Sequence, residues 1–334
     1  MGVPFFCVYF FVFCSIFAIM YRDGKQFFNK ALVLHMNLSS VGDNICVLPV
    51  LLYMIKHSQS ELILGVMKGK ECIYQPFIGD TKMLHCYQTE EMINARNVLF
   101  RQAFFARITN TKISLIDYFS MTLGDMLLDI KDKNYPKYPV ADIDVSEFDV
   151  DFKNCVAIDT NYMWRTRSMH GKTINEIAEY IKSIGLTPLF VGKEYKSPEG
   201  QRGGYRLVQA SKDIRFDLGK NLINKTTLPQ TFKILSEVRC LVGTDGGLMH
   251  MCGMTDTPMV IGFTVTKPEL RFPIRNNEVG YNCHAVLPEA KCKFCMMNMF
   301  MEMRHDFQYC IYDDYKCIDE LTSDKFIKKL KLVL

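Results

Sequence analysis

The sequence lacks the excess of one charge sign that nucleic-acid-binding proteins carry. Its 334 residues contain 40 Lys and Arg against 36 Asp and Glu, a formal net charge of +4, with the two signs interspersed. Nucleic acids are bound largely through clustered basic residues, so this balance disfavours a nucleic-acid partner. The composition is otherwise that of a globular protein, and the length favours two domains of about 150 residues each.

The sequence also lacks charge over residues 3–21, "VPFFCVYFFVFCSIFAIMY". A helix of this length, at ~1.5 Å per residue, nearly crosses a ~30 Å hydrocarbon core. No basic residue precedes the run and no A-x-A-like site follows it, which disfavours a cleaved secretory signal. Arg22, Lys25 and Lys30 come next, so an anchor here would leave the chain in the cytoplasm at the inner face of the membrane. The alternative is translation from Met20, which leaves at most a peripheral association.

Thirteen cysteines are scattered along the chain rather than packed into a short, loop-rich sequence. This pattern is typical of buried, reduced thiols in a cytosolic protein. The exception is a C-terminal group, called here the cysteine group, made of a CxxC pair and two further thiols: Cys292, Cys295, Cys310 and Cys317. Thiolates at CxxC spacing can share one tetrahedral ion, so a structural zinc ion and four unligated thiols are both open interpretations.

Hydrophobic patterning predicts a βαβ unit in the first half of the chain. Residues 31–36 form an apolar run, the polar loop "NLSSVGD" follows, and residues 44–58 have the pattern of a helix. A second strand is predicted at 61–67, parallel to the first. Residues 131–154 are charged and carry prolines, which marks the boundary between domains.

The alternation of strands and helices restarts beyond that boundary. Strands are predicted at 155–160, 186–192, 240–243 and 258–263, and helices at 172–185, 227–239 and 247–254. Thr173 and Glu176 are expected to form a capping box and Gly185 to follow the last turn of the first helix. Thr227, with Gln230 three residues on, is the expected N-cap of the second. The apolar face of the first helix comprises Ile174, Ile177, Ala178, Ile181 and Ile184.

A glycine turn between the strand at 240–243 and the next helix is the first candidate site. Gly246 and Gly247 stand where backbone amides and the positive end of the helix dipole favour a phosphate. His250, one helical turn further, can donate to a phosphate oxygen, and Asp245 can fix the loop or accept from a sugar hydroxyl. The alternative is a plain turn with a buried core histidine.

The second candidate is Asp43, which follows Gly42 at the start of the first predicted helix. A carboxylate at the cleft edge of the first domain can accept a proton from an acceptor hydroxyl, the role of a general base in group transfer. Asp is also a preferred N-cap residue, and capping the helix of residues 44–58 is the alternative.

These two motifs, in this order, resemble glycosyltransferase family 9, the heptosyltransferase-like group. Residues 33–51 are similar to the family's N-terminal signature, a strand and a loop ending in Leu-Gly-Asp before a helix with a proline. Residues 224–260 resemble its C-terminal signature, Gly-Lys-Thr-Ser-Leu followed by a helix, a strand and Asp-Ser-Gly-x-x-His. The segment "GFTVTKPELRFP" looks like its Gly-x-Thr-x-Pro turn, and the resemblance covers about residues 31–325.

The resemblance implies an α/β protein of the GT-B fold, with two Rossmann-like domains whose parallel sheets face a central cleft. We expect an acceptor-binding domain at 25–145 and a nucleotide-sugar-binding domain at 146–334, with the cysteine group and a final helix, while residues 1–24 lie outside both. The implied activity moves a heptose or another hexose-like sugar from a nucleotide sugar, with inversion and no catalytic metal. The implied acceptor is a hydroxyl of a glycan or glycolipid, as in lipopolysaccharide or other surface-glycan assembly. No cofactor is implied beyond the nucleotide-sugar co-substrate.

Site residues follow from the resemblance by position. Asp43 falls on the family's proposed base. Gly246 replaces a family serine, and the family's lysine-x-tryptophan segment is not recognisable, so Arg165, Arg167 or Lys172 is expected to supply that cation. The expected nucleotide-sugar site comprises Thr160, Asn161, Lys172, Glu194, Thr226, Asp245, Gly246, Gly247 and His250.

Two other functions stay open. One is a transferase of the same fold that acts on modified nucleic-acid bases, against which the charge balance argues. The other is a non-catalytic protein that binds glycans or nucleotides, against which the presence of both Asp43 and His250 argues.

Overall fold

The computed structural model describes the parts of the chain that build two parallel sheets and the junction between them. The described residues are 32–37, 40–57, 61–85, 96–101, 132–160, 165–193, 213–295, 310, 312 and 314–334. The apolar run at 3–21 lies outside them. None of the helices within these ranges has the length and apolar character needed to cross a bilayer.

The first sheet has the order β3-β2-β1-β4, and all its strands are parallel. Its strands are β1 (Leu32–Asn37), β2 (Leu62–Val66), β3 (Lys82–His85) and β4 (Arg96–Arg101). The helices are α2 (Val41–Cys46), α3 (Leu48–His57), α4 (Glu71–Tyr74) and the 3₁₀ turn η1 (Gln75–Phe77). The predicted βαβ unit is confirmed.

The single helix expected at 44–58 is instead two helices, α2 and α3. The first begins earlier, at Val41, and Val47 separates the two. Pro49 has no amide hydrogen to bond the carbonyl of Ile45, so the sequence interrupts one continuous helix at this point.

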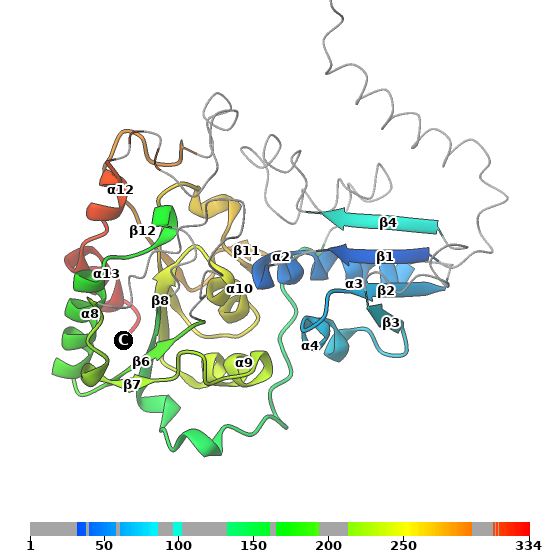
Figure 1. The fold of residues 1–334 in the computed structure, drawn as a ribbon, viewed down its shortest axis with the longest axis horizontal. Coiled ribbons are helices and arrows are strands. Elements are labelled where there is room, and N and C mark those ends of the chain that lie inside the picture. The colour runs from blue at the N-terminus through cyan, green and yellow to red at the C-terminus, as the bar shows by residue number, and fades with distance from the viewer. Residues whose placement is uncertain are drawn as a thin grey trace, which may run out of the picture.

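The second sheet has the order β12-β9-β8-β5-β6-β7, again all parallel (Figure 1). Its strands are β5 (Cys155–Asp159), β6 (Thr187–Val191), β7 (Lys220–Asn221), β8 (Cys240–Thr244), β9 (Met259–Gly262) and β12 (Cys283–Val286). The main helices are α8 (Gly171–Ser183), α9 (Leu228–Glu237), α10 (Gly247–Gly253), α12 (Lys316–Asp319) and α13 (Ser323–Leu330). Every strand and helix expected in this half is present, within a few residues of its predicted bounds.

Shorter elements complete the described part of this half. They are the 3₁₀ turns η3 (Ser146–Phe148), η4 (Phe152–Asn154), η5 (Arg165–Arg167), η7 (Phe216–Leu218) and η8 (Pro268–Leu270), and the antiparallel pair β10 (Ile274–Arg275) and β11 (Glu278–Val279).

Some of the helix caps predicted from the sequence are present and one is not. Thr227 and Gln230 form the expected capping box of α9. The capping box expected of Thr173 and Glu176 is wrong, because α8 begins earlier, with His170 as its N-cap, and the two side chains instead bond residues near α13. Gly185, at φ +80°, follows the C-cap of α8 as expected.

Four of the five apolar residues predicted for the face of α8 are fully buried. The fifth, Ile184, is 42% exposed because the helix has ended there.

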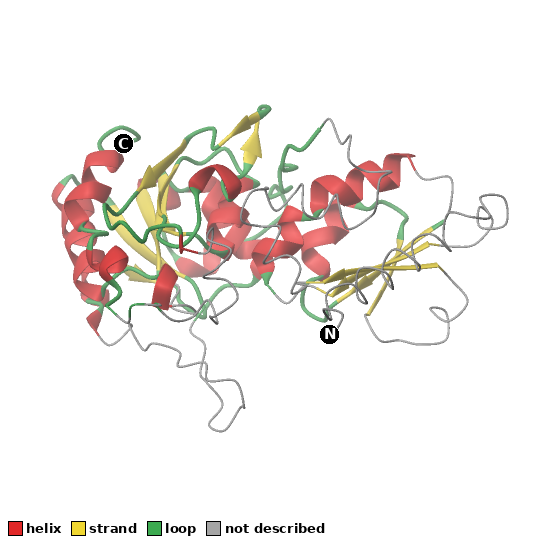
Figure 2. Cartoon of the chain, turned by 90° about the horizontal axis from the view of Figure 1, so that it is seen from above, coloured by secondary structure: helices red, strands yellow, loops and turns green. Residues whose placement is uncertain are grey.

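Helices of both halves gather between the two sheets (Figure 2). One continuous apolar cluster spans them, including Ile45 and Leu48 from the first half and Leu235 and Met249 from the second. The connector, residues 132–154, crosses this junction with Tyr135 buried in the same cluster. Helices α2 and α10, which come after β1 and β8, therefore pack against one another at this interface.

Candidate active site at the junction of the two sheets

The strand order of each sheet reverses at one strand. β1 lies between β2 and β4, and β5 lies between β6 and β8. Ligands of parallel sheets sit beyond the carboxyl ends of the strands at such reversals. Asp43 lies in the helix that follows β1, and Asp245 directly follows β8, so both candidate motifs stand at the expected edge of a sheet.

Asp43 does not cap α2. The N-cap is Ser40, whose side-chain oxygen accepts a hydrogen bond of 3.0 Å from the backbone N–H of Asp43. Asp43 is the third residue of the helix, and its side chain is half-buried. The alternative that Asp43 serves as the cap is therefore wrong, while a carboxylate at the first turn of α2 fits a base.

Asp245 is enclosed by donors on several sides. Its Oδ2 accepts a hydrogen bond of 2.8 Å from the Thr266 hydroxyl, and it lies 3.5 Å from Nη1 of Arg167 and 3.9 Å from Nε of Arg271. Burial alone would raise the pKa of this carboxyl, but the two guanidinium groups outweigh it, and the pKa lies below its ordinary value. The ionised carboxylate thus fixes the loop, one of its two expected roles, and gathers two cations at the glycine turn.

Arg167 owes its position to the loop that follows β5. Its carbonyl accepts a 2.6 Å hydrogen bond from the Thr244 hydroxyl, and the neighbouring carbonyl of Thr166 accepts one from Thr264. The Arg167 side chain remains 26% exposed, so it can reach a ligand as well as Asp245.

The two other candidate cations have different neighbours. Arg165 packs its guanidinium 3.8 Å from the centroid of the Tyr315 ring. Lys172 is 86% exposed, lies 3.8 Å from Glu176, and lines a surface cavity of about 530 Å³ together with Asp213 and other polar residues. Of the three, Arg167 is the one that the structure brings to Asp245.

His250 is buried and bonded through Nδ1. This nitrogen lies 3.0 Å from the Tyr135 hydroxyl and 3.5 Å from Sγ of Cys46. Burial lowers the pKa of His250 from 6.5 to about 4, against the opposing effect of the carboxylates of Asp245 and Asp43. The imidazole is therefore neutral at pH 7.

The glycine turn brings α10 close to α2. Gly246 is the extended N-cap of α10, and its carbonyl accepts a 3.4 Å hydrogen bond from the backbone N–H of His250. A Cβ built on Gly42 would lie 2.7 Å from Cδ2 of His250, and one on Gly247 would lie 3.6 Å from Cβ of Val41. Glycine at position 42 thus permits the close approach of the two helices.

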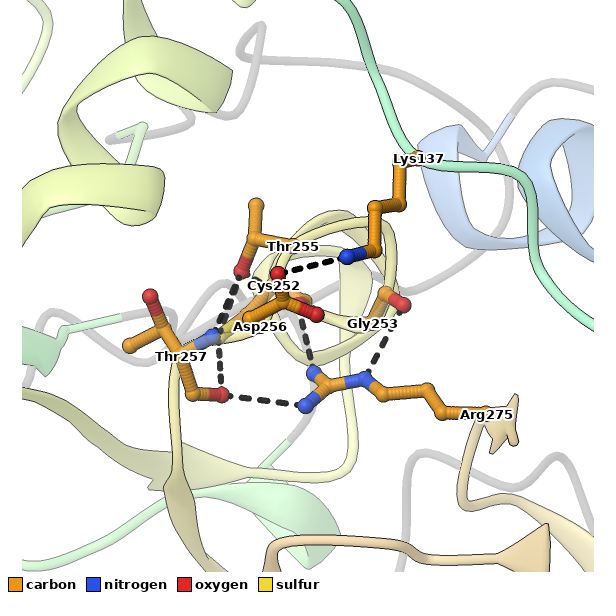
Figure 3. Close-up of polar contacts among 7 residues, drawn as sticks. All are labelled: Lys137, Cys252, Gly253, Thr255, Asp256, Thr257 and Arg275. Atoms are coloured by element: carbon orange, nitrogen blue, oxygen red, sulfur yellow. Dashed lines mark hydrogen bonds and ion pairs between the residues drawn. The ribbon is translucent and has the colours of Figure 1, made fainter.

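The opposite end of α10 is held by Arg275 (Figure 3). The buried guanidinium donates to the carbonyls of Gly253 at 3.1 Å, Cys252 at 2.5 Å and Thr257 at 3.1 Å. These carbonyls lie at and beyond the C-terminus of the helix, where a cation is favourable. Arg275 therefore anchors the helix that carries His250.

The remaining expected residues of the nucleotide-sugar site are only partly described. The Thr160 hydroxyl, at the end of β5, donates to the carbonyl of Val191 at 3.1 Å. The Thr226 hydroxyl lies 2.9 Å from that of Thr231. Asn161 and Glu194 lie outside the described residues.

The four thiols of the cysteine group influence one another. Burial raises the pKa of Cys317 to about 12, and the charges of Cys292, Cys295 and Cys310 act in the same direction. Cys317 belongs to a small buried cluster against which Cys292 and Cys310 pack. Within the described ranges, no three His, Cys, Asp or Glu side chains are arranged closely enough to hold a metal ion.

Four residues of this site were not expected from the sequence: Cys46, Tyr135, Thr266 and Arg271. Thr266 and Arg271 fall within "GFTVTKPELRFP", so the turn motif marked their segment without their roles. Cys46 and Tyr135 lack any local signal, because only the fold brings them to His250.

Comparisons with known proteins found one family profile and several solved structures that resemble the chain. Residues 191–297 match the sequence profile of glycosyltransferase family 9 (heptosyltransferase). TibC from enterotoxigenic E. coli H10407, described as a bacterial iron-containing dodecameric glycosyltransferase, is similar with a TM-score of 0.69 and 15% identity, over 91% of this chain and 76% of that one.

Two further solved structures share the fold. A family 9 glycosyltransferase from Veillonella parvula DSM 2008 has a TM-score of 0.62 and 12% identity, over 92% of this chain and 98% of that one. The E. coli ADP-heptose lps heptosyltransferase II has a TM-score of 0.58 and 11% identity, over 91% and 98%. No curated protein sequence matches the chain significantly.

The two parallel sheets and the solved structures that resemble them show the fold that the sequence predicts, that of GT-B glycosyltransferases. The profile match lies in the half of the chain that carries Asp245 and His250, and the predicted resemblance to glycosyltransferase family 9 is confirmed.

Proposed function

We propose that the protein transfers a heptose or another hexose-like sugar from a nucleotide sugar to a hydroxyl of a glycan or glycolipid, with inversion and without a catalytic metal. The observation that carries the proposal is the contact of the Asp43 helix with His250, beside a turn that gathers two arginines. TibC has been solved with ADP-D-beta-D-heptose, and this ligand supports a nucleotide-sugar donor here.

The donor diphosphate binds beside the turn at Gly246 and Gly247. As the bond from the anomeric carbon to the diphosphate breaks, negative charge develops on the leaving oxygen. Arg167, Arg271 and the imidazole of His250 surround Asp245, and they supply the stabilisation that a metal ion provides in other transferases.

Asp43 acts as the general base. It takes the proton of the acceptor hydroxyl while that oxygen forms a bond to the anomeric carbon on the side opposite the diphosphate. The nucleoside diphosphate leaves with the electron pair of the broken bond, so the anomeric configuration inverts.

The test is Asp43→Asn, assayed for transfer from ADP-, UDP- and GDP-sugars to surface-glycan acceptors. We expect turnover to fall by about a hundredfold or more, since a general base contributes at least that much, while donor affinity stays close to that of the wild type. Asp256→Asn is the matched control, because Asp256 is exposed and pairs with Lys137. An Asp43→Asn enzyme with full turnover would remove Asp43 from the mechanism.

We also propose that the cysteine group binds a structural metal ion, either zinc or iron. Binding would have to draw the four thiols together, because no three of them stand at metal-binding spacing in the described structure. Four thiolates suit both metals, and TibC is described as iron-containing. Cys292→Ser should reduce the metal content of the purified full chain, measured by elemental analysis, whereas Cys72→Ser, outside the group, should not. Equal metal content in the two variants and the wild type would refute the site.

Finally, we propose that the enzyme works at the inner face of the membrane, where its glycolipid acceptor lies. Chains beginning at Met1 and Met20 can be fractionated side by side. Membrane recovery of the longer chain alone would support an anchor at residues 3–21, and a soluble longer chain with an intact N-terminus would contradict it.

A further inference from the structure

Three polar groups from three segments of the chain meet in the core of the junction. Sγ of Cys46, on α2, lies 2.9 Å from the Tyr135 hydroxyl, which lies 3.0 Å from Nδ1 of His250, on α10. All three side chains are buried. The connector is fixed here, because the backbone N–H of Tyr135 donates to the carbonyl of Ile274 at 2.9 Å.

Only one arrangement of the hydrogens of Cys46, Tyr135 and His250 lets the Tyr135 hydroxyl donate to the imidazole nitrogen, the strongest acceptor of the three groups. A phenol has a single hydrogen to donate, and an imidazole nitrogen accepts far better than a thiol sulfur. The Tyr135 hydroxyl therefore donates to Nδ1 of His250, and the Cys46 thiol donates to the Tyr135 oxygen. A neutral imidazole that accepts through Nδ1 carries its hydrogen on Nε2.

The protonation states required by this chain are those that the surroundings favour. Burial, the largest cause, raises the pKa of both Cys46 and Tyr135, so both keep their hydrogens at neutral pH. Burial likewise keeps His250 neutral. The charged groups that act on His250 are two carboxylates, which favour its cation, and two guanidinium groups, which oppose it: Asp43, Asp245, Arg167 and Arg271.

We propose that Tyr135 is a positioning residue that holds His250 as the neutral tautomer with its hydrogen on Nε2. The consequence of this tautomer rests on the proposed function: the Nε2–H group donates a hydrogen bond to a phosphoryl oxygen of the sugar donor. A histidine of the opposite tautomer would present a lone pair to that anion and repel it. A residue of the connector between the two sheets thus determines whether His250 presents a hydrogen-bond donor or an acceptor to the nucleotide sugar.

The tautomer can be measured without substrate. In the full chain labelled with ¹⁵N-histidine, long-range ¹H–¹⁵N correlation spectra at pH 7 distinguish a protonated from an unprotonated ring nitrogen, and His250→Gln assigns the signal among the seven histidines. We expect His250 to show a protonated Nε2 and an unprotonated Nδ1. A protonated Nδ1 in the wild type would overturn the inference.

Tyr135→Phe tests the role of the hydroxyl. Without this donor the neutral ring loses its preference for a hydrogen on Nε2, so a mixture of tautomers should appear. Tyr138→Phe is the matched control. Tyr138 lies in the same connector, but its hydroxyl donates to the carbonyl of Cys72, at 2.8 Å, and not to His250. An unchanged His250 spectrum in Tyr135→Phe would contradict the proposal.

Kinetics supply the second readout. With Tyr135→Phe, kcat should fall about tenfold with little change in the KM of the acceptor, as expected for one lost hydrogen bond, and Tyr138→Phe should leave kcat unchanged. Wild-type kcat in Tyr135→Phe would overturn the positioning role. A wild type that transfers no sugar would refute the proposed function instead, and the tautomer spectra would still decide the role of Tyr135.

Discussion

Gly42 and His250 come from opposite halves of the chain and lie in direct contact, with 2.7 Å between the position of a Cβ on Gly42 and Cδ2 of His250. Gly42, the residue before the proposed base, thus also packs directly against the ring of His250. The helix that carries Asp43 therefore restrains the ring of His250.

Gly42→Ala should therefore destabilise the protein. The added methyl group must displace the buried ring or separate the helices, which costs about 1–3 kcal/mol for overpacking of this kind. Gly247→Ala is the matched control, because its Cβ would meet Val41 at an ordinary 3.6 Å. Urea unfolding measures both. Equal stability of the two variants would show that α2 and α10 do not pack as closely as described.

Arg167 should bind the donor, and the other two candidate cations should not. Arg167→Ala is expected to weaken nucleotide affinity by about tenfold or more, since it removes a charged hydrogen-bond donor. Arg165→Ala and Lys172→Ala should bind like the wild type, because these side chains contact Tyr315 and Glu176 instead. A larger effect of Lys172→Ala than of Arg167→Ala, measured by calorimetry, would reverse the assignment.

The buried histidine predicts a loss of stability in mild acid. The pKa of His250 is about 4 in the folded protein and 6.5 as its ordinary value, so the unfolded chain binds more protons between these values. Its stabilisation is complete above pH 6.5 and is lost as the pH falls toward 4, a change of about 3 kcal/mol at most. The depressed pKa of Asp245 adds a further loss at still lower pH.

His250→Gln should flatten this dependence. Urea unfolding of the wild type and the variant from pH 8 to pH 4 gives the two curves. The same slope in both would mean that another group titrates in this window.

The end of α10 offers a contrast between a buried and an exposed cation. Arg275→Met removes the guanidinium from three carbonyls, of which, among the described residues, only that of Cys252 keeps strong donors, from Thr255, and it should cost about 2–4 kcal/mol of unfolding free energy. Lys137→Met breaks the ion pair with Asp256. The two side chains of this pair are 73% and 77% exposed, so the free energy of unfolding should change little. Thermal unfolding of the two variants measures both, and a small effect of Arg275→Met would contradict the anchoring of α10.

Much of the fold could be predicted from the sequence because its signals are local. The alternation of strands and helices predicted the βαβ unit of the first sheet and four strands of the second, and the Thr227 capping box marked the start of α9. The alternation did not predict the outer strands β3, β4, β7 and β12. The expectations that were wrong concern competition at helix ends. Ser40 caps α2 in place of Asp43, and Thr173 bonds the carbonyl of Leu321, a residue that no local pattern places beside α8.

The site was predictable where motifs mark it and not where the fold assembles it. Asp43, Asp245 and His250 stand in recognisable turns at the ends of strands. Tyr135 reaches His250 across 115 positions of sequence, and Cys46 reaches it across 204. Neither contact has a periodicity or spacing that sequence reasoning can use, because both depend on how the two halves pack.

The central claim is that a nucleotide binds at the turn from Asp245 to His250. Calorimetric titration of the full chain with ADP, GDP, UDP and CDP, with His250→Ala and Tyr138→Phe in parallel, tests it most directly. We predict that one nucleotide binds to the wild type and to Tyr138→Phe, and that His250→Ala weakens this binding. The claim would be contradicted if the folded wild type bound none of the four, or if His250→Ala bound the nucleotide as tightly as the wild type.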